Sequence, residues 1–239
     1  MPAVRLIGPG RAGRSLARAL AAADGWRVAG VLGRVDDVAA AAVGVDLLVL
    51  AVPDAAVAGV AAAVRPSPGC AVAHLAGSLT LDVLGHHDRR ASIHPLVAIP
   101  TPDTQLAGRW FAVAGDPIAG RVVDALRGRA IAVADADRVA YHAAACIASN
   151  HLVALLGQVE RVAEQAGVPL DAYLDLVRGT VDNVAALGPA AALTGPVARG
   201  DWATVDRHRA AIDARELPGY DAMVDLALRL REREQISCG

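Results

Sequence analysis

A glycine-rich turn near the start of the chain constrains its fold more than any other feature. The apolar run Ala3–Ile7 leads into Gly8-Pro9-Gly10-Arg11-Ala12-Gly13, and an Ala- and Leu-rich helical pattern follows. In a G-x-G-x-x-G turn between strand and helix, the first glycine permits the tight turn and the second admits a pyrophosphate. The third packs the helix against the strand. The amides that open the helix then face the anion. We therefore expect residues 8–13 to bind a dinucleotide.

Strand-like and helical segments alternate along the first half of the chain. Apolar runs typical of buried strands cover residues 3–7, 26–32, 46–52, 70–75, 90–93, 110–114 and 130–133. Helical patterns cover residues 11–23, 35–42, 55–64 and 118–126, and after Asp135 only helical spacing remains, at 138–166, 170–187, 202–215 and 219–234. This order predicts an α/β protein. A doubly wound Rossmann sheet domain over residues 1–136 is followed by an all-helical domain over 137–239.

Composition excludes several classes of protein. The chain has no lysine, and its 23 basic residues against 25 acidic ones leave no surplus to bind nucleic acid. Cys70, Cys146 and Cys238 are widely spaced, which fits a reducing cytoplasm and neither a disulfide framework nor a zinc site. The adjacent His86 and His87 are poorly spaced to ligate one ion, so no metal is expected.

One long stretch, residues 139–159, lacks Asp, Glu, Lys and Arg. Its length raises the question of a membrane span, but polar residues such as His142, Asn150 and Gln158 are costly in lipid. We therefore expect a buried helix here and no membrane partner. A helical domain so rich in Ala and Leu also predicts that its remaining apolar face is covered in a homodimer.

The tip of the second predicted strand bears on the choice of cofactor. NAD sites of this fold usually place Asp or Glu there to bind the ribose 2′-hydroxyl. Here Gly33 leaves room, and Arg34 can pair with a 2′-phosphate, with Arg11 adding to the cluster. NADP is therefore expected in preference to NAD, with a solvated Arg34 as the alternative. The expected cofactor surface is completed by residues after the third and fourth strands: Val52, Pro53 and Gly77.

His94 follows the fifth predicted strand, at the carboxyl edge of the sheet. A histidine at this edge faces the cleft, and its ordinary pKa near 6.5 suits proton exchange; a structural hydrogen-bonding role is the alternative. On the helix that begins near residue 138, His142, Ser149 and Asn150 share one side. That polar stripe needs partners, either from a neighbouring helix or from a ligand.

The segment 194–201 joins two helices and contains an arginine suited to bind a carboxylate. We expect the catalytic and substrate-binding roles to be divided among a small set of residues. His94 or His142 exchanges the proton, Ser78 and Asn150 orient the reacting oxygen, and Ser149, Thr194 and Arg199 bind the substrate.

Several of these motifs resemble a bacterial family of small Rossmann-like oxidoreductases with a helical C-terminal domain of unknown function. The resemblance rests on the N-terminal glycine turn, His94-Pro95-Leu96, the segment 141–150 and the segment 193–201. The wider superfamily includes ketopantoate reductase, pyrroline-carboxylate reductase, prephenate dehydrogenase and the β-hydroxyacid dehydrogenases. The resemblance implies hydride transfer between NAD(P) and a small carboxylated carbonyl, imine or alcohol, often in a dimer.

The chain departs from two of these relatives at the proton donor. The resemblance aligns Ser149 and Asn150 with positions near the active site of the β-hydroxyacid dehydrogenases, but Cys146 stands where those enzymes carry a lysine. A thiol is not an equivalent donor, and the lysine acid of the ketopantoate reductases is missing too. Ser78 and His94 resemble more closely the Ser and His-Pro of the prephenate dehydrogenases.

The sequence thus predicts an NADP-preferring oxidoreductase that reduces a small carboxylated carbonyl or imine, with a ketopantoate-like 2-keto acid as one candidate substrate. Two alternatives remain open. One is an NADP-binding sensor without turnover, since no single residue is unambiguous as the acid. The other is an enzyme that oxidises a prephenate-like hydroxyl.

Overall fold

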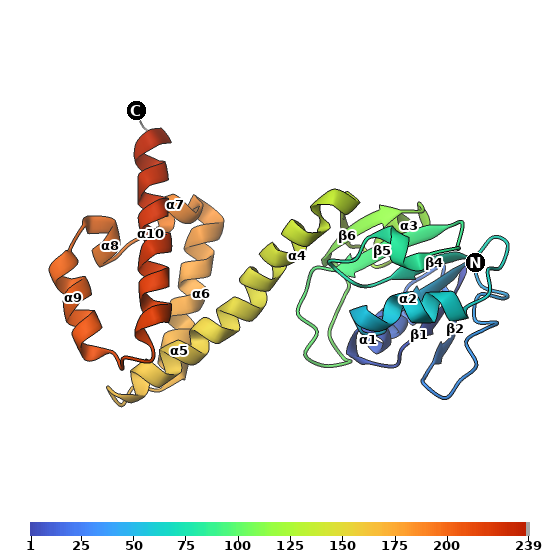
Figure 1. Ribbon diagram of the computed structural model, residues 1–239, viewed down its shortest axis with the longest axis horizontal. Coiled ribbons are helices and arrows are strands. Elements are labelled where there is room, and N and C mark those ends of the chain that lie inside the picture. Colours follow the sequence, from blue (N-terminus) through green and yellow to red (C-terminus); the bar gives the residue numbers. More distant parts are fainter. Residues whose placement is uncertain (238–239) are drawn as a thin grey trace. The chain divides into compact units, whose positions relative to one another are not determined.

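The computed structural model describes the backbone of residues 1–237 and the side chains through residue 232, so Cys238 lies outside the described residues. The chain forms two compact units, Met1–Ile147 and Ala148–Gly239 (Figure 1). The division follows the first helix after the sheet. The sequence analysis placed Tyr141 and His142 in the helical domain. They belong to the sheet unit instead, because their rings contact a residue of the sheet.

The first unit is built on a seven-stranded sheet in the order β2-β1-β3-β4-β5-β6-β7. All strand pairs are parallel except β5 with β6, and the order reverses at β1, between β2 and β3. The strands are β1 (Ala3–Ile7), β2 (Arg27–Leu32), β3 (Leu47–Leu50), β4 (Ala71–His74), β5 (Arg90–Pro95), β6 (Trp110–Gly115) and β7 (Arg129–Ala132). The predicted Rossmann sheet is confirmed.

Two apolar clusters cover the two faces of this sheet. Helices α1 (Arg11–Ala21) and α3 (Ile118–Ala125) pack their apolar residues on one face. Helix α2 (Asp54–Ala63) and the 3-10 helix Leu81–Leu84 pack on the other. Leu47, Leu48, Val49 and Leu50 are all buried, because a strand covered on both faces has no polar side.

The helix predicted over residues 35–42 is wrong, because the segment forms turns. The Asp36 carboxylate accepts the Gly33 amide N–H at 2.6 Å, and the Asp37 carboxylate accepts the Ala39 N–H at 2.8 Å. Aspartate side chains that bind nearby backbone amides compete with helical hydrogen bonds. The apolar periodicity of the segment did not outweigh this local competition.

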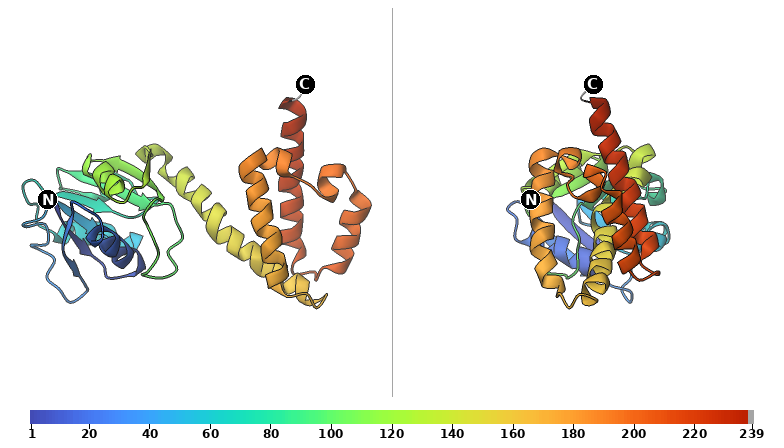
Figure 2. Two further views of the ribbon diagram at one scale, coloured as in Figure 1. Left: turned by 180° about the vertical axis from the view of Figure 1, so that it is seen from behind. Right: turned by 90° about the vertical axis from the view of Figure 1, so that its left-hand side faces the viewer.

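After β7 the chain is helical, as predicted. Helix α4 (Arg138–Cys146), a π-helical turn (Ile147–His151) and α5 (Leu152–Glu164) follow one another, so the single helix predicted over 138–166 is interrupted. In the second unit α5 contacts α6, and α7 and α8 contact α10 (Figure 2). The remaining helices are α6 (Leu170–Leu187), α7 (Pro189–Ala192), α8 (Pro196–Arg199), α9 (Trp202–Ala211) and α10 (Leu217–Ser237).

The helical run Asp135–Glu164 is not buried as the sequence predicted. Its most apolar window is long and apolar enough to cross a membrane by length and composition, and none of that window is buried. Val139 and Val153 are each about 70% exposed. The expectation of a buried core helix is therefore not met within either unit.

Candidate functional site

The glycine turn after β1 is packed so tightly that only glycine fits at two of its positions. A Cβ atom on Gly8 would lie 2.3 Å from the Ala51 carbonyl oxygen, and the φ angle of Gly8 is +111°. A Cβ on Gly13 would lie 2.0 Å from the Gly8 carbonyl oxygen. These contacts hold the start of α1 against the ends of β1 and β3, as expected for the first and third glycines.

Gly10, the middle glycine, faces open space. A Cβ atom there would meet nothing within 4 Å, and Gly10 caps α1 without any side-chain hydrogen bond. The amides of the first helical turn thus have no capping side chain and lie beside an open cradle, with the exposed Pro9 and half-buried Ala12 on either side. A dinucleotide pyrophosphate fits such a cradle, since helix N-termini bind anions through these amides.

Arg11 does not reach toward the strand tip. Its Nη1 donates to the Pro100 carbonyl at 3.4 Å. Ser15 donates to the Pro102 carbonyl at 3.0 Å, and Arg18 forms an ion pair with Asp103. Helix α1 therefore holds the loop between β5 and β6, and the structure gives Arg11 a partner other than the phosphate predicted for it.

The tip of β2 carries an acidic residue that the sequence analysis missed. The Asp36 carboxylate returns to accept the Gly33 amide, and a Cβ atom on Gly33 would lie 3.7 Å from both Asp36 Oδ2 and Pro9 Cγ. Arg34 lies between Gly33 and Asp36 in the sequence, and its side chain is exposed. The place expected for a 2′-phosphate is thus bordered by one cation and one carboxylate. An Asp three residues beyond the strand tip was the available signal.

The ends of β3 and β4 contribute further predicted residues. Val52 is half-buried and Pro53 exposed where β3 leads into α2. The Ser78 hydroxyl donates to the Asp54 carboxylate at 3.4 Å. Ser78, predicted to orient a reacting oxygen, is therefore held from the first residue of α2.

Gly77, His94 and His142 meet in the sheet unit. The ring centroids of the two histidines are 6.0 Å apart and their planes are 74° apart. A Cβ atom on Gly77 would lie 2.5 Å from His142 Cδ2 and 3.0 Å from His94 Nε2. Because Gly77 has no side chain, both imidazole edges can pack closely against its Cα. Residues predicted separately from a strand end and a helix thus form one cluster.

His94 has a hydrogen-bond partner that was not predicted. Its Nδ1 lies 2.7 Å from the hydroxyl oxygen of Tyr141, and the two rings meet edge to face at 88°. Tyr141 precedes His142 in α4, so the same helix presents both groups to the end of β5. The available signal was its place beside His142 in the first turn of a helix that carries no Asp, Glu or Arg after Arg138.

Electrostatics keep His94 neutral near pH 7. Burial, together with the nearby His142 and Arg138, lowers the pKa of His94 to about 4. Arg138 is fully buried; its Nε donates to Asp135 at 3.1 Å, while Nη1 and Nη2 have no hydrogen-bond partner among the described residues. Burial also lowers the pKa of His74, at the end of β4, to about 4. Arg138 and His74 were likewise missed by sequence reasoning.

The remaining predicted residues belong to the second unit. The Ser149 hydroxyl donates to Asn150 Oδ1 at 2.8 Å, within the π-helical turn. Thr194 and Arg199 are both exposed, on either side of Pro196 at the start of α8. The structure brings Ser149 and Asn150 together.

Cys146, in the sheet unit, places its Sγ 3.9 Å from both ring nitrogens of His142. Among the described residues, no group of three or more His, Cys, Asp or Glu side chains is placed to hold a metal ion.

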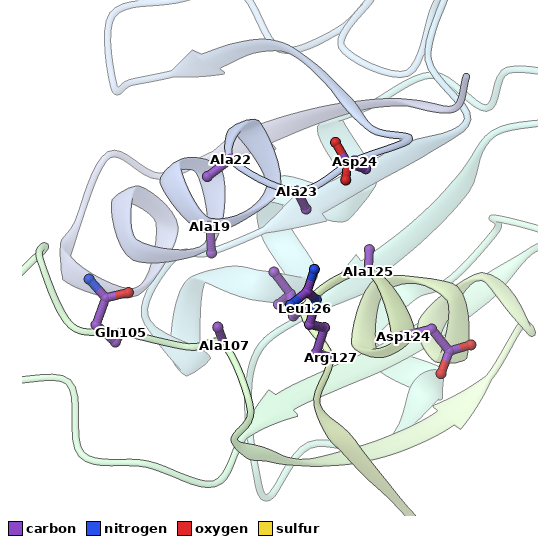
Figure 3. Close-up of a pocket in the computed structure, with 10 residues that line it drawn as sticks. All are labelled: Ala19, Ala22, Ala23, Asp24, Gln105, Ala107, Asp124, Ala125, Leu126 and Arg127. Carbon is purple, nitrogen blue, oxygen red and sulfur yellow. The ribbon is translucent and has the colours of Figure 1, made fainter.

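A separate cavity of about 440 Å³ lies between α1 and α3 (Figure 3). Half of its lining residues are alanine, from the C-terminal ends of the two helices, the residues just after α1 and the loop after β5, which also contributes Gln105. None of the predicted site residues lines it. The lining residues are Ala19, Ala22, Ala23, Asp24, Gln105, Ala107, Asp124, Ala125, Leu126 and Arg127.

Comparison with known proteins finds a similarity in the C-terminal part of the chain. Residues 112–226 match the family model of a domain of unknown function (DUF2520). The match begins in β6 and ends in α10, so the matched region includes the end of the sheet as well as helices. No curated protein matches the chain significantly.

Solved structures with the same fold include three whose descriptions name an enzyme. A protein described as an NADP oxidoreductase, from Bacteroides fragilis, is 20% identical over 97% of this chain and 98% of its own, with a TM-score of 0.76. A reductive aminase from Aspergillus terreus, solved with NADPH and ethyl levulinate, is 18% identical over 96% and 94%, with a TM-score of 0.68. A 1-pyrroline-5-carboxylate reductase from Streptococcus pyogenes is 15% identical over 95% and 98%, with a TM-score of 0.64.

At these identities the likeness establishes the fold. The resemblance predicted from the sequence is confirmed at that level: a Rossmann-like sheet domain followed by helices, as in NADP-linked oxidoreductases and pyrroline-carboxylate reductase.

Proposed function

We propose that the protein is an NAD(P)-dependent oxidoreductase that reduces a small carboxylated carbonyl or imine, such as a ketopantoate-like 2-keto acid. The observation that carries this proposal is the open cradle at Gly10 in a turn whose other glycines are locked by packing. A second polar cluster, at His94, follows another parallel strand of the same sheet. Ligands of doubly wound sheets bind at the carboxyl ends of their strands.

When bound, the nicotinamide supplies the hydride, so the protein has to bind, orient and protonate. The amides that open α1 hold the pyrophosphate, and Gly33 with Arg34 lies near the adenosine ribose. His94 or His142 provides the proton beside Gly77. Ser78 orients the reacting oxygen. For the second unit we propose the roles predicted from sequence, in which Asn150 orients the same oxygen and Ser149, Thr194 and Arg199 bind the substrate carboxylate.

The composition bears on the proposed proton donor, and the fold supports the proposed reduction. The chain has no lysine, so the proton has to come from another residue, and the His94 cluster is the polar group that the sheet unit brings together. The fold is also shared with a reductive aminase solved with NADPH and with a pyrroline-carboxylate reductase. NADP is our first choice of cofactor, with Asp36 acting against it.

The test compares Gly10→Ala with Gly120→Ala, since a Cβ atom meets nothing within 4 Å at either position. Both variants are expected to fold, because the added methyl group changes helix or cap stability by only about 1 kcal/mol. Calorimetric titration with NADPH should show affinity weakened at least tenfold in Gly10→Ala alone, because the methyl group fills the pyrophosphate cradle. Equal NADPH affinity in both variants, or no binding by the wild type, would overturn the cofactor proposal.

Turnover is tested by absorbance at 340 nm in both directions, with small keto acids, cyclic imines and prephenate-like alcohols. Substrate-dependent NADPH oxidation that is lost in His94→Gln supports the reductase. Binding of NADPH without turnover on any of these compounds would favour the sensor, and reduction of NADP by the alcohols would favour the oxidative enzyme.

We further propose that the protein is a homodimer located in the cytoplasm, with no membrane or nucleic-acid partner. Exposed apolar side chains on α5 and α6, such as Val153 and Leu176, need a cover. A second copy of the chain can provide this cover with an apolar surface of the same kind. Residues 139–159 carry no formal charge, so pairing of two copies would bury no unpaired charge there. Leu176, 66% exposed, is the residue at which this is tested below.

A further inference from the structure

The two ring nitrogens of His94 have different surroundings. Nδ1 is 2.7 Å from the Tyr141 hydroxyl oxygen, within hydrogen-bond distance. Nε2 lies on the other side of the ring, near Gly77 and the edge of His142, and has no hydrogen-bond partner among the described residues that the structure shows. A substrate atom that receives a proton from His94 must therefore receive it from Nε2. In a neutral imidazole, the hydrogen-bond partner of one ring nitrogen determines whether the other nitrogen carries the hydrogen.

A charged His94 is not available as the proton donor near pH 7. The groups around it are His74 from β4, Arg138 and His142 from α4, and Asp54 from α2. Of these only Asp54 favours the protonated ring, while burial and the three basic groups disfavour it. Arg138 is fully buried; it pairs with Asp135 through Nε, while Nη1 and Nη2 have no hydrogen-bond partner among the described residues. His94 therefore has to give up a proton while neutral, which requires a replacement proton at the same time.

We propose that Tyr141 is a positioning residue that acts through His94: its hydroxyl holds the imidazole hydrogen on Nε2 and supplies a proton to Nδ1 as Nε2 releases its own. The inference rests on the proposed function, which requires a proton for the reduced atom. It adds a relay that explains how a buried neutral histidine can deliver that proton without passing through an imidazolium.

Atoms and electrons balance in the step. The reduced nicotinamide gives a hydride to the carbonyl or imine carbon, and the substrate oxygen or nitrogen takes the proton from His94 Nε2. The Tyr141 Oη–H bond breaks as the Nδ1–H bond forms, so His94 changes tautomer and stays neutral. Burial raises the pKa of Tyr141 and the charge of Arg138 lowers it, so Arg138 favours the transient phenolate. The half-buried hydroxyl then regains a proton from water.

The chain contains a matched control. In the helical unit His208 Nδ1 lies 2.9 Å from the Tyr220 hydroxyl oxygen, and the two rings meet edge to face at 83°. This pair has nearly the same geometry as His94 and Tyr141. No role in binding or catalysis is proposed for it. Tyr220→Phe therefore removes the same hydroxyl–imidazole bond outside the candidate site.

The first test reads the tautomer directly and needs no substrate. Nitrogen NMR spectra of the full-length, 15N-histidine-labelled protein, with and without NADPH, identify the protonated nitrogen, and His94→Gln assigns the resonance. We expect a neutral, Nε2-protonated His94 from pH 5 to 8, and a mixture of tautomers in Tyr141→Phe. Tyr220→Phe should change the His208 signals alone. A wild-type His94 protonated on Nδ1, or one indifferent to Tyr141→Phe, would overturn the relay.

The second test uses the substrate found in the absorbance screen. Tyr141→Phe should lower kcat by about 10²–10³-fold, the range of general acid catalysis, with the affinity for NADPH unchanged. Its kcat should also rise as the pH falls toward 5, since only a charged His94 can then donate, whereas the wild-type profile stays flat. Unchanged kcat in Tyr141→Phe contradicts the relay. A wild type without turnover contradicts the proposed function instead, and the NMR experiment still decides the relay.

Discussion

The two units of this protein bury their side chains to very different degrees. In the sheet unit every residue of β3 and β4 is buried, and helices cover both faces. In the helical unit, within the described residues, only Ala163, Val205 and Val224 are buried. Large apolar side chains of that unit lie exposed instead, among them Leu152, Val153, Leu155, Leu176, Val181, Val184, Leu187, Trp202, Met223 and Leu226.

Because of this difference, the two units are stabilised by different interactions. The sheet unit holds a core of its own, since burying an aliphatic side chain contributes about 1.5–3 kcal/mol. The helical unit is stabilised instead by local interactions at the ends of its helices. Gly200 ends α8 in the left-handed conformation, and Asp201 caps α9 by accepting the Thr204 amide at 3.1 Å. Caps contribute about 1 kcal/mol each and do not replace a core, which is why we propose that a second copy covers the apolar residues of this unit.

The largest expected effect comes from comparing one leucine in each unit. Leu6→Ala, at a fully buried position of β1, should lower the free energy of unfolding by about 2–5 kcal/mol at any protein concentration. Leu176→Ala should cost less than about 0.5 kcal/mol if Leu176 is truly exposed, but 1 kcal/mol or more if a second copy covers it. Urea unfolding at several protein concentrations, with sedimentation to measure association, separates these cases. A wild-type monomer whose stability does not depend on concentration contradicts the dimer.

The second comparison sets buried His74 against exposed His151. A histidine whose pKa is about 4 when folded and about 6.5 when unfolded binds fewer protons in the folded state. The contribution of neutral His74 to the free energy of unfolding is therefore complete above pH 6.5. It is lost as the pH falls from 6.5 toward 4, by about 3 kcal/mol at most. Urea unfolding at pH 7 and pH 4.5 should show a smaller acid loss in His74→Gln than in the wild type, and no such change in His151→Gln. Equal acid losses in all three proteins would contradict the burial assigned to His74.

The sequence predicted the sheet unit well, because its signals are local and redundant. An apolar run long enough for a strand, followed by helical spacing, located all seven strands to within two residues at either end. The segment 35–42 failed because the bonds from Asp36 and Asp37 to the backbone leave no trace in hydrophobic periodicity. The burial predicted for the helical run also failed, since periodicity shows that a face is apolar and not what covers it.

The candidate site was predictable one residue at a time and not as a cluster. His94 was found from its place at a strand end, and His142 from its place on a helix. Their meeting beside Gly77 depends on how α4 leaves the sheet, which no local pattern encodes. Tyr141 and Arg138 were missed for the same reason. Tyr141 matters because it contacts His94, which lies 47 residues away in the sequence. Arg138 matters because it is completely buried.

The smallest expected effect compares two aspartates that each accept a backbone amide, Asp36 in the sheet unit and Asp201 in the helical unit. Asp36→Asn keeps a side-chain oxygen for the Gly33 amide and removes the charge facing a 2′-phosphate. Its free energy of unfolding should change little, while the ratio of NADPH to NADH affinity should rise about tenfold, or about 1.4 kcal/mol.

Asp201→Ala is the matched control for that charge. It removes the cap of α9 and should lower stability by about 1 kcal/mol without changing the coenzyme ratio. Calorimetric titration of each variant with both coenzymes, alongside urea unfolding, measures the two effects separately. If Asp36→Asn leaves the ratio unchanged, its carboxylate does not face the ribose. Arg34 would then be left without an opposing charge at the strand tip, and the NADP preference would rest on that arginine alone.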